Sequence, residues 1–240
     1  MRKANREAFS HPIDVSFDAH SDAGGHDPDS HSLTLRRYHR LLWSKPLPNG
    51  SVFVLDEWLN HKSDLGEFSL SSDAFLHTYS KWKRYQHVIN QVPQEELDEF
   101  IGTGWTIGQC IVFPSNRIDG KSTINAARGW NRSICDRFDL TLECIRRHYA
   151  GEGSPLSVVL ERYHEFFALF KDFRGYVEFF LLQDLVSDDF REICFFLPFE
   201  GFGKSALPAD VEEYLQYKKN SLDFLRKRSR RIEEWARGLE

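Results

Sequence analysis

The chain of 240 residues contains only four cysteines and a single methionine. The cysteines lie far apart and include no C-x-x-C pair; they are Cys110, Cys135, Cys144 and Cys194. Disulfide-stapled small domains and zinc knuckles both need closely spaced or paired cysteines. The spacing therefore excludes both classes, and we expect four buried thiols in a reducing compartment.

Long apolar runs are also missing. The longest ones, such as residues 179–182, are far too short for a membrane-spanning helix, which needs about 20 apolar residues. The opening residues MRKANREAFSHPIDV lack the apolar segment of a secretory signal. We therefore expect a cytoplasmic protein that has no membrane partner.

The sequence has no excess of positive charge. Lys and Arg number 31 against 36 Asp and Glu, which gives a net charge of -5. This balance argues against a protein that coats nucleic acid with its whole surface, while local basic patches remain compatible with it. Apolar residues make up 41% of the chain and include 20 Phe, which is enough for a core built on aromatic rings.

One domain accounts for most of the chain. Residues 1–32 are polar and are interpreted as an N-terminal arm, and residues 33–240 as a single domain that ends in a long charged helix. Periodicity and capping residues predict helices over 33–44, 73–91, 94–100, 122–149, 155–170, 176–186 and 209–237. Apolar segments between turn residues predict strands over 51–58, 67–73, 105–113 and 192–199. We predict an α+β fold, helix-dominated, with a small and mainly antiparallel sheet.

The segment VFPSNRIDGKSTINAAR, residues 112–128, resembles a phosphate-binding loop between a strand and a helix. Such a loop begins with a glycine that tolerates unusual backbone angles, but Ser115 stands at that position. Asp119 would also place a carboxylate beside the phosphates. Because Asp-Gly is a common turn pair and Ser122 can cap a helix, we interpret the segment as a turn that begins a helix.

The helix predicted over 122–149 carries the most informative polar residues. At 100° per residue, one face holds Asn125, Arg128, Arg132, Asp136, Asp139, Glu143, Arg146 and Arg147. We favour a solvated face with i,i+4 ion pairs, Arg132 with Asp136 and Glu143 with Arg147. The alternative is a buried polar channel for an anionic ligand. Arg137 projects to the apolar side and needs a carboxylate there, for which Asp184 is a candidate.

Basic residues occur beside aromatic ones in two stretches, RRYHRLLWSK (36–45) and KWKRY (81–85). These residue types contact phosphates and stack on bases. The final helix is also locally basic, so local patches allow nucleic acid as a partner. The ligand-binding candidates are Arg36, Arg37, His39, Trp43, Lys45, Arg132, Arg146 and Arg147.

A cluster of Asp and His in residues 17–31 resembles a metal site. It contains Asp18, His20, Asp22, His26, Asp27, Asp29 and His31. A two-metal phosphoesterase needs further His ligands that the later sequence does not supply, and the calcium-loop pattern fails because Ala23 replaces its glycine. We predict no metal site, and no motif identifies a cofactor.

Four stretches resemble an uncharacterised bacterial family that is catalogued only as a domain of unknown function. They are DPDSHSLTLRRYHRLLWSKPLPNG (27–50), IDGKSTINAARG (118–129), DRFDLTLECIRRHY (136–149) and FRGYVEFFLLQDLV (173–186). The resemblance covers roughly residues 17–210. It implies a bacterial cytoplasmic protein built as one domain, and it carries no activity, ligand or catalytic residue over to this chain.

Two functional hypotheses follow. The first is a binding module for a protein or an anionic ligand, whose surface joins residues 34–45 to Arg128, Arg132 and Arg146. The second is an enzyme that acts on nucleic acid or nucleotides, in a mobile-element or defence setting. Its arginines would bind phosphate and a carboxylate would act as base, with the candidates Asn125, Arg128, Asp136, Asp139 and Glu143.

Overall fold

A computed structural model describes residues 22–56, 58–63, 66–103 and 106–238. The first half of the chain forms α3 (Pro28–His31), α4 (Leu33–Ser44), β1 (Asn60–Ser63), β2 (Gly66–Ala74), η1 (Lys83–Tyr85), α5 (Gln86–Ile89), α6 (Gln94–Gly102), η2 (Ile107–Gln109) and β3 (Cys110–Pro114). The second half forms α7 (Ile124–Trp130), α8 (Phe138–Ala150), α9 (Ser157–Arg162), α10 (His164–Ala168), α11 (Phe173–Phe179), η3 (Gln183–Leu185) and α12 (Val211–Arg237). The predicted helix-dominated α+β class is confirmed.

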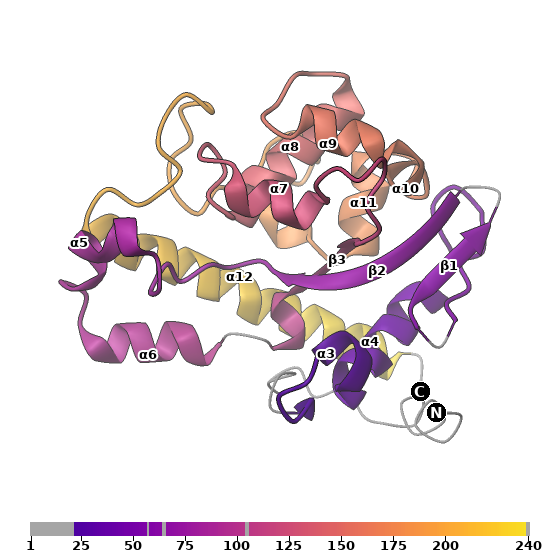
Figure 1. Ribbon diagram of the computed structural model, residues 1–240, viewed down its shortest axis with the longest axis horizontal. Coiled ribbons are helices and arrows are strands. Elements are labelled where there is room, and N and C mark those ends of the chain that lie inside the picture. Colours follow the sequence, from indigo (N-terminus) through magenta and orange to yellow (C-terminus); the bar gives the residue numbers. More distant parts are fainter. Residues whose placement is uncertain (1–21, 57, 64–65, 104–105, 239–240) are drawn as a thin grey trace.

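The three strands form one antiparallel sheet in the order β1-β2-β3. Asn60 pairs with Ser69, and Leu70 pairs with Pro114. All five residues of β3 are buried, and β2 curves between two groups of helices (Figure 1). The small antiparallel sheet is therefore as predicted, and β3 is its buried edge.

The two groups of helices lie on opposite sides of the sheet, with α7 to α11 on one side and α3, α4 and α12 on the other (Figure 1). Successive residues of a strand point to opposite faces, and β2 shows this directly. His39 of α4 lies 2.8 Å from the Ser72 hydroxyl, whereas Arg128 of α7 donates to the next residue, Asp73, at 2.8 Å. The sheet therefore separates α4 from α7.

Helix α12 is tied to the core by a buried arginine. Arg228 donates to the carbonyl oxygen of Gly108 at 2.6 Å, to that of Phe180 at 3.1 Å and to the hydroxyl of Tyr38 at 3.0 Å. Its guanidinium also lies 4.5 Å from the ring centre of Phe75. These contacts replace the hydration that a buried guanidinium loses, because its N–H groups all need acceptors.

Several predicted elements differ in the structure. The helix predicted over 73–91 is wrong, since β2 continues to Ala74 and only the short η1 and α5 follow it. Residues 51–56 form no strand, and only one bridge, between Val186 and Ile193, lies in the region of the strand predicted over 192–199. In these places tertiary contacts override local propensity.

The single helix predicted over 122–149 is also wrong. A turn separates α7 from α8, and Cys135 and Asp136 within it have φ angles of 47° and 62°. A left-handed backbone cannot continue a right-handed helix. The helical-wheel face drawn across this segment therefore does not exist as one face.

Within the described residues, no helix is long and apolar enough to cross a membrane. Cys110, Cys135 and Cys144 are buried free thiols, whereas Cys194 is exposed. The expectation of four buried thiols is therefore correct for three positions and wrong for Cys194.

Candidate functional site

A cavity of about 770 Å³ lies between the segment that follows β2 and the segment from α7 to the next turn. His77, Trp82, Lys83 and Arg84 line it from the first segment. The second segment contributes Asn125, Ala126, Gly129, Trp130, Arg132 and Asp136. The walls therefore combine aromatic rings, cationic groups, one amide and one carboxylate.

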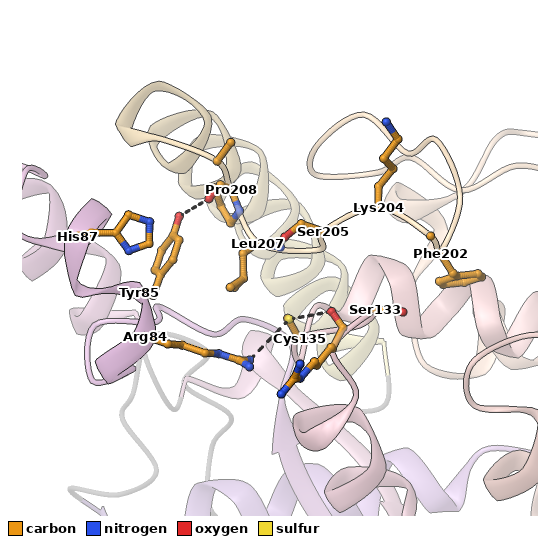
Figure 2. A pocket seen from close by; sticks show the side chains of 13 residues that line it. Arg84, Tyr85, His87, Ser133, Cys135, Phe202, Lys204, Ser205, Leu207 and Pro208 are labelled. Atoms are coloured by element: carbon orange, nitrogen blue, oxygen red, sulfur yellow. Dashed lines mark hydrogen bonds between the residues drawn. The ribbon is translucent and has the colours of Figure 1, made fainter.

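A second cavity of about 650 Å³ shares Arg84 and Arg132 with the first (Figure 2). It extends past Tyr85 and His87 to the loop that precedes α12, where it is lined by Phe202, Gly203, Lys204, Ser205, Leu207, Pro208 and Ala209. No Asp or Glu lines it among the described residues. We call the two cavities together the basic groove.

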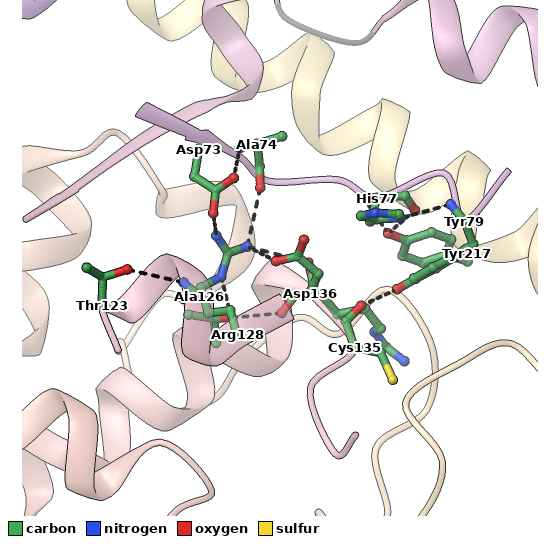
Figure 3. Close-up of polar contacts among 12 residues, drawn as sticks. Asp73, Ala74, His77, Tyr79, Thr123, Ala126, Arg128, Cys135, Asp136 and Tyr217 are labelled. Carbon is green, nitrogen blue, oxygen red and sulfur yellow. Dashed lines mark hydrogen bonds and ion pairs between the residues drawn. The ribbon is translucent and has the colours of Figure 1, made fainter. Parts of the chain in front are cut away.

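A buried arginine lies behind Asp136 of the cavity lining and binds several polar groups (Figure 3). Arg128 is 0% exposed, and its NH1 donates to Asp73 Oδ2 at 2.8 Å while its NH2 lies 3.5 Å from Asp136 Oδ1. Its Nε donates to the Thr141 hydroxyl at 3.0 Å, and its NH2 to the carbonyl of Ala74 at 3.3 Å. The buried positive charge is thus compensated by two carboxylates, of which Asp136 lines the cavity.

The turn that presents Asp136 is strained. Two consecutive residues other than glycine, Cys135 and Asp136, adopt positive φ angles. Tertiary contacts hold them there, because the Tyr79 hydroxyl donates to the Cys135 carbonyl at 2.8 Å and the Asp136 amide donates to the Arg128 carbonyl at 3.3 Å. Such strain persists only where the surroundings enforce it, and it concentrates at functional sites.

His77 offers a proton to the cavity rather than a lone pair. Its Nδ1 accepts a hydrogen bond from the amide of Tyr79 at 3.0 Å, and burial lowers the pKa of its ring. The neutral ring therefore carries its proton on Nε2, which makes that nitrogen a donor.

The rim of the groove carries exposed positive charges without acidic partners. Among the described residues, no carboxylate lies within ion-pair distance of Lys83, Arg84 or Arg132. The guanidinium of Arg84 lies 4.4 Å from the ring centre of Trp82, and its NH2 lies 3.9 Å from Cys135 Sγ (Figure 2). Burial raises the pKa of the Cys135 thiol, so this cysteine stays protonated at neutral pH.

Three of the five predicted catalytic candidates meet at this site, namely Asn125, Arg128 and Asp136. The other two lie elsewhere. Asp139 is fully buried, pairs with Arg137 at 2.6 Å and accepts the amide of Phe196. Glu143 pairs with Arg146 at 2.8 Å and with Arg147 at 2.7 Å, away from the cavity lining.

The expected solvated face is wrong, because Arg128, Asp139 and Glu143 are buried. The predicted pair of Glu143 with Arg147 is present, whereas Asp136 pairs with Arg128 instead of Arg132. The predicted pair of Arg137 with Asp184 is also wrong. Asp139 is the partner of Arg137, and Asp184 binds Arg231 of α12 at 2.5 Å.

The ligand-binding candidates of α4 are mostly internal. Arg36 is buried and donates to the carbonyl of Asp29, His39 lies 3.3 Å from the carboxylate of Asp29, and the Trp43 ring is 4.2 Å from that of Phe53. Arg37 is half-buried on the same helix. Since the sheet separates α4 from α7, these residues do not share one surface with Arg132.

Lys45, which follows α4, is also turned inward. Its ammonium donates to the carbonyl of Phe179 and lies over the rings of Phe179 and Trp235, at 4.6 and 4.9 Å from their centres. Burial lowers its pKa to about 7. The side chain anchors the last turns of α12 rather than facing a ligand.

The loop that resembles a phosphate-binding loop is a turn, as predicted. Asp119 and Gly120 have φ angles of 53° and 67°, and Lys121 is exposed outside the groove. The predicted cap is displaced by one residue, since Thr123 rather than Ser122 accepts the amide of Ala126. The turn serves to begin α7, and α7 carries Asn125 and Arg128.

The acidic and histidine residues near the N-terminus have structural contacts. Asp22 accepts the Ser32 hydroxyl at 2.7 Å, Asp27 caps α3, and Asp29 accepts the amide of Ser72 at 2.9 Å. Asp18 and His20 lie outside the described residues. The described part of the chain contains no group of three or more His, Cys, Asp or Glu that could hold a metal ion.

Sequence reasoning missed His77, which fell within a predicted helix that does not form, and Asp73, whose partner Arg128 lies 55 positions away in the sequence. It also missed Trp130, whose exposure no local pattern reveals. The KWKRY stretch was the usable signal, since it supplies Trp82, Lys83 and Arg84 to the cavity.

Comparisons with known proteins identify a family but no activity. No curated protein and no solved structure gave a match to the chain. A family model does match, over residues 13–232. Because this match covers most of the chain, including every residue of the basic groove, the protein belongs to the family described as a family of unknown function (DUF6994).

Proposed function

We propose that this protein binds an anionic ligand in the basic groove. The observation that carries the proposal is the position of Arg84 and Arg132. Both are exposed, neither has a carboxylate partner among the described residues, and both line the two adjoining cavities. Guanidinium groups bind phosphate and carboxylate oxygens through two parallel hydrogen bonds, which makes such a pair suited to anions.

Other groups of the groove support an anionic ligand. Lys83 and Lys204 add positive charge along its edges, and His77 contributes a neutral donor. Among the described residues, Asp136 is the single carboxylate of the lining, and the adjacent guanidinium of Arg128 compensates its charge. Asp136 therefore supplies an acceptor for a donor group on the ligand without repelling its anionic part strongly. The bacterial cytoplasm, where the sequence places the protein, stays a prediction.

Isothermal titration calorimetry with inorganic polyphosphate tests the proposal. The variant Arg84→Gln/Arg132→Gln should bind about tenfold or more weakly, because charge-assisted hydrogen bonds contribute about 1.5–3 kcal/mol each. The matched control is Arg117→Gln/Arg230→Gln, which removes the same charge from exposed positions outside the groove. Equal losses in both variants, or no binding to the unmodified protein, would contradict the proposal.

An enzyme that acts on nucleic acid or nucleotides is the second candidate, and one observation favours it. Asp73 and Asp136 both lie beside Arg128, Asp136 lines the cavity, and burial raises the pKa of Asp73. A carboxyl group with a raised pKa near a second carboxylate is suited to acid–base catalysis. Hydrolysis assays with nucleotides and oligonucleotides, with and without magnesium, test it. Activity that Asp136→Asn removes would support the enzyme, and absence of any turnover would leave the binding function.

A further inference from the structure

We propose that the ligand of the basic groove is a single-stranded nucleic acid, with one base stacked on Trp130. This inference rests on the proposed anion-binding function and goes beyond it by naming the ligand class. It follows from three features of the groove, namely its exposed tryptophan, an unpaired amide oxygen in its lining, and cations and rings in both adjoining cavities.

The first feature is the exposed ring of Trp130. It lies at the end of α7, lines the first cavity and is 86% exposed. An indole exposed at a cavity beside cations offers a face on which a ligand ring can stack. Trp82 lines the same cavity, and Arg84 already covers part of its ring. Aromatic side chains beside cations are the usual platform for unstacked bases, whose faces they accept regardless of sequence.

Asn125 lines the same cavity as Trp130. Its Nδ2 donates weakly to the Ser71 hydroxyl at 3.4 Å, and its Oδ1 is buried and has no hydrogen-bond partner among the described residues. Buried polar atoms are nearly always satisfied in the functional state. A base offers ring and amino N–H donors at its edge, so Asn125 and Asp136 together fit a base better than they fit a bare phosphate.

The groove extends over two adjoining cavities, which favours a chain-like ligand over a compact one. Arg84 and Arg132 stand where the two cavities adjoin, Lys83 lines the first cavity and Lys204 the second. Phe202 provides another ring in the second cavity. Cations and rings line both of the adjoining cavities, and a single strand presents both phosphates and unstacked bases. A duplex hides the faces of its bases in the stack, so it cannot use these rings.

The overall charge gives a strand no general attraction, because the whole chain has a net charge of -5. The exposed cations that line the groove must therefore supply the attraction locally.

Fluorescence anisotropy with labelled 12-nucleotide oligo(dT) and oligo(U) tests the inference on the full chain. Trp130→Ala should weaken binding of both strands about tenfold, since stacking contributes about 1–3 kcal/mol per base. It should leave the affinity for inorganic polyphosphate within about twofold, because polyphosphate has no ring to stack. Trp58→Ala is the matched control, as Trp58 is 54% exposed and lies outside the groove.

Salt dependence gives an independent measurement. The slope of log affinity for the strand against log salt concentration should be lower in magnitude by about 1.4 in Arg84→Gln/Arg132→Gln, since each phosphate contact contributes about 0.7. Trp130→Ala should leave the slope unchanged.

The outcomes separate the two proposals. Binding of polyphosphate with no tighter binding of the strands, or strand binding that Trp130→Ala does not weaken, would overturn the nucleic-acid inference and leave the anion-binding function. Equal affinity for a mononucleotide or a duplex of the same sequence would also overturn it. Failure of all anions to bind would overturn both.

Discussion

Arg128 of α7 donates to Asp73 of β2 at 2.8 Å, and this contact joins the sheet to the wall of the basic groove (Figure 3). The two residues lie 55 positions apart in the sequence. Their contact places Asp136, which also faces Arg128, at the edge of the cavity. The stability of the domain and the geometry of the candidate site therefore depend on the same guanidinium.

Arg128→Met should destabilise the protein strongly. Removing one partner of a buried ion pair leaves the other charges uncompensated, and we expect a loss of about 3–5 kcal/mol in the free energy of unfolding. Urea denaturation measures it. Adding Asp73→Asn should restore part of the loss, because it removes one of the orphaned charges. A loss below about 1 kcal/mol would show that the ion pair of Arg128 with Asp73 does not stabilise the fold.

Lys45 should make the free energy of unfolding depend on pH. Burial lowers the pKa of Lys45 to about 7 in the folded state, against 10.5 as its ordinary value. The unfolded chain therefore binds more protons between pH 7 and 10.5, and the contribution of Lys45 to stability increases as the pH rises through this range. Below pH 7 the penalty of burying the charge is fully present.

Comparison with Lys45→Met isolates this contribution. The free energy of unfolding of Lys45→Met minus that of the unmodified protein should fall as the pH rises from 7 to 10. One unit of pKa corresponds to about 1.4 kcal/mol, so a pKa lowered from 10.5 to about 7 gives an expected fall of about 3–4 kcal/mol between pH 7 and 10. Urea denaturation at three pH values measures the difference. A constant difference would contradict the lowered pKa.

Two helical glycines should respond in opposite ways to alanine. In Gly175→Ala the new Cβ would lie 2.1 Å from the carbonyl oxygen of Phe170, which is backbone and cannot move away. We expect a loss of about 1–3 kcal/mol despite the better helix propensity of alanine. In Gly129→Ala the nearest atom is 4.0 Å away, so stability should rise by up to about 1 kcal/mol. Thermal denaturation of both variants decides the matter, and similar changes in both would refute the argument.

Asn125 should affect ligand binding more than Lys121 does. Asn125→Asp adds a negative charge to the cavity wall beside Asp136, so anion affinity should fall about tenfold. Lys121→Gln removes a charge that is exposed outside the groove and should change affinity less than about twofold. Calorimetry with polyphosphate measures both. A larger loss of affinity in Lys121→Gln would indicate that the loop at residues 115–122 binds the anion.

His77 should report on the ligand directly. Burial holds its pKa below the ordinary value of 6.5, and a bound anion should raise that pKa because it favours the charged ring. NMR titration with and without polyphosphate measures the change. The rise should disappear in Arg84→Gln/Arg132→Gln, and a rise of the same size in that variant would place the anion elsewhere.

Much of the fold follows from local patterns. The helix over 33–44 matches α4, the acidic helix over 94–100 lies within α6, and the final helix matches α12 within two residues. Each has either a strong apolar periodicity or a clear cap, and these signals act within a few residues of the chain. The predicted strand over 67–73 is present within β2 for the same reason.

The candidate site was only partly predictable. Asn125, Arg128 and Asp136 were identified as polar candidates, but on a helical face that the turn at Cys135 and Asp136 abolishes. Their true arrangement depends on contacts with Asp73 and Tyr79, which come from segments more than 50 residues away. Periodicity contains no information about such partners.

The sequence by itself determined the class of the fold, the family and the residue types available to the candidate site. Composition, periodicity and capping act locally, so they can be read along the chain. The tertiary structure decided which charges are buried in pairs and which remain free. Arg128 and Arg132 are four residues apart, yet one is enclosed by two carboxylates and the other is exposed at the groove. The difference arises because charge compensation depends on distance in space, and only the packing of α7 against β2 fixes those distances.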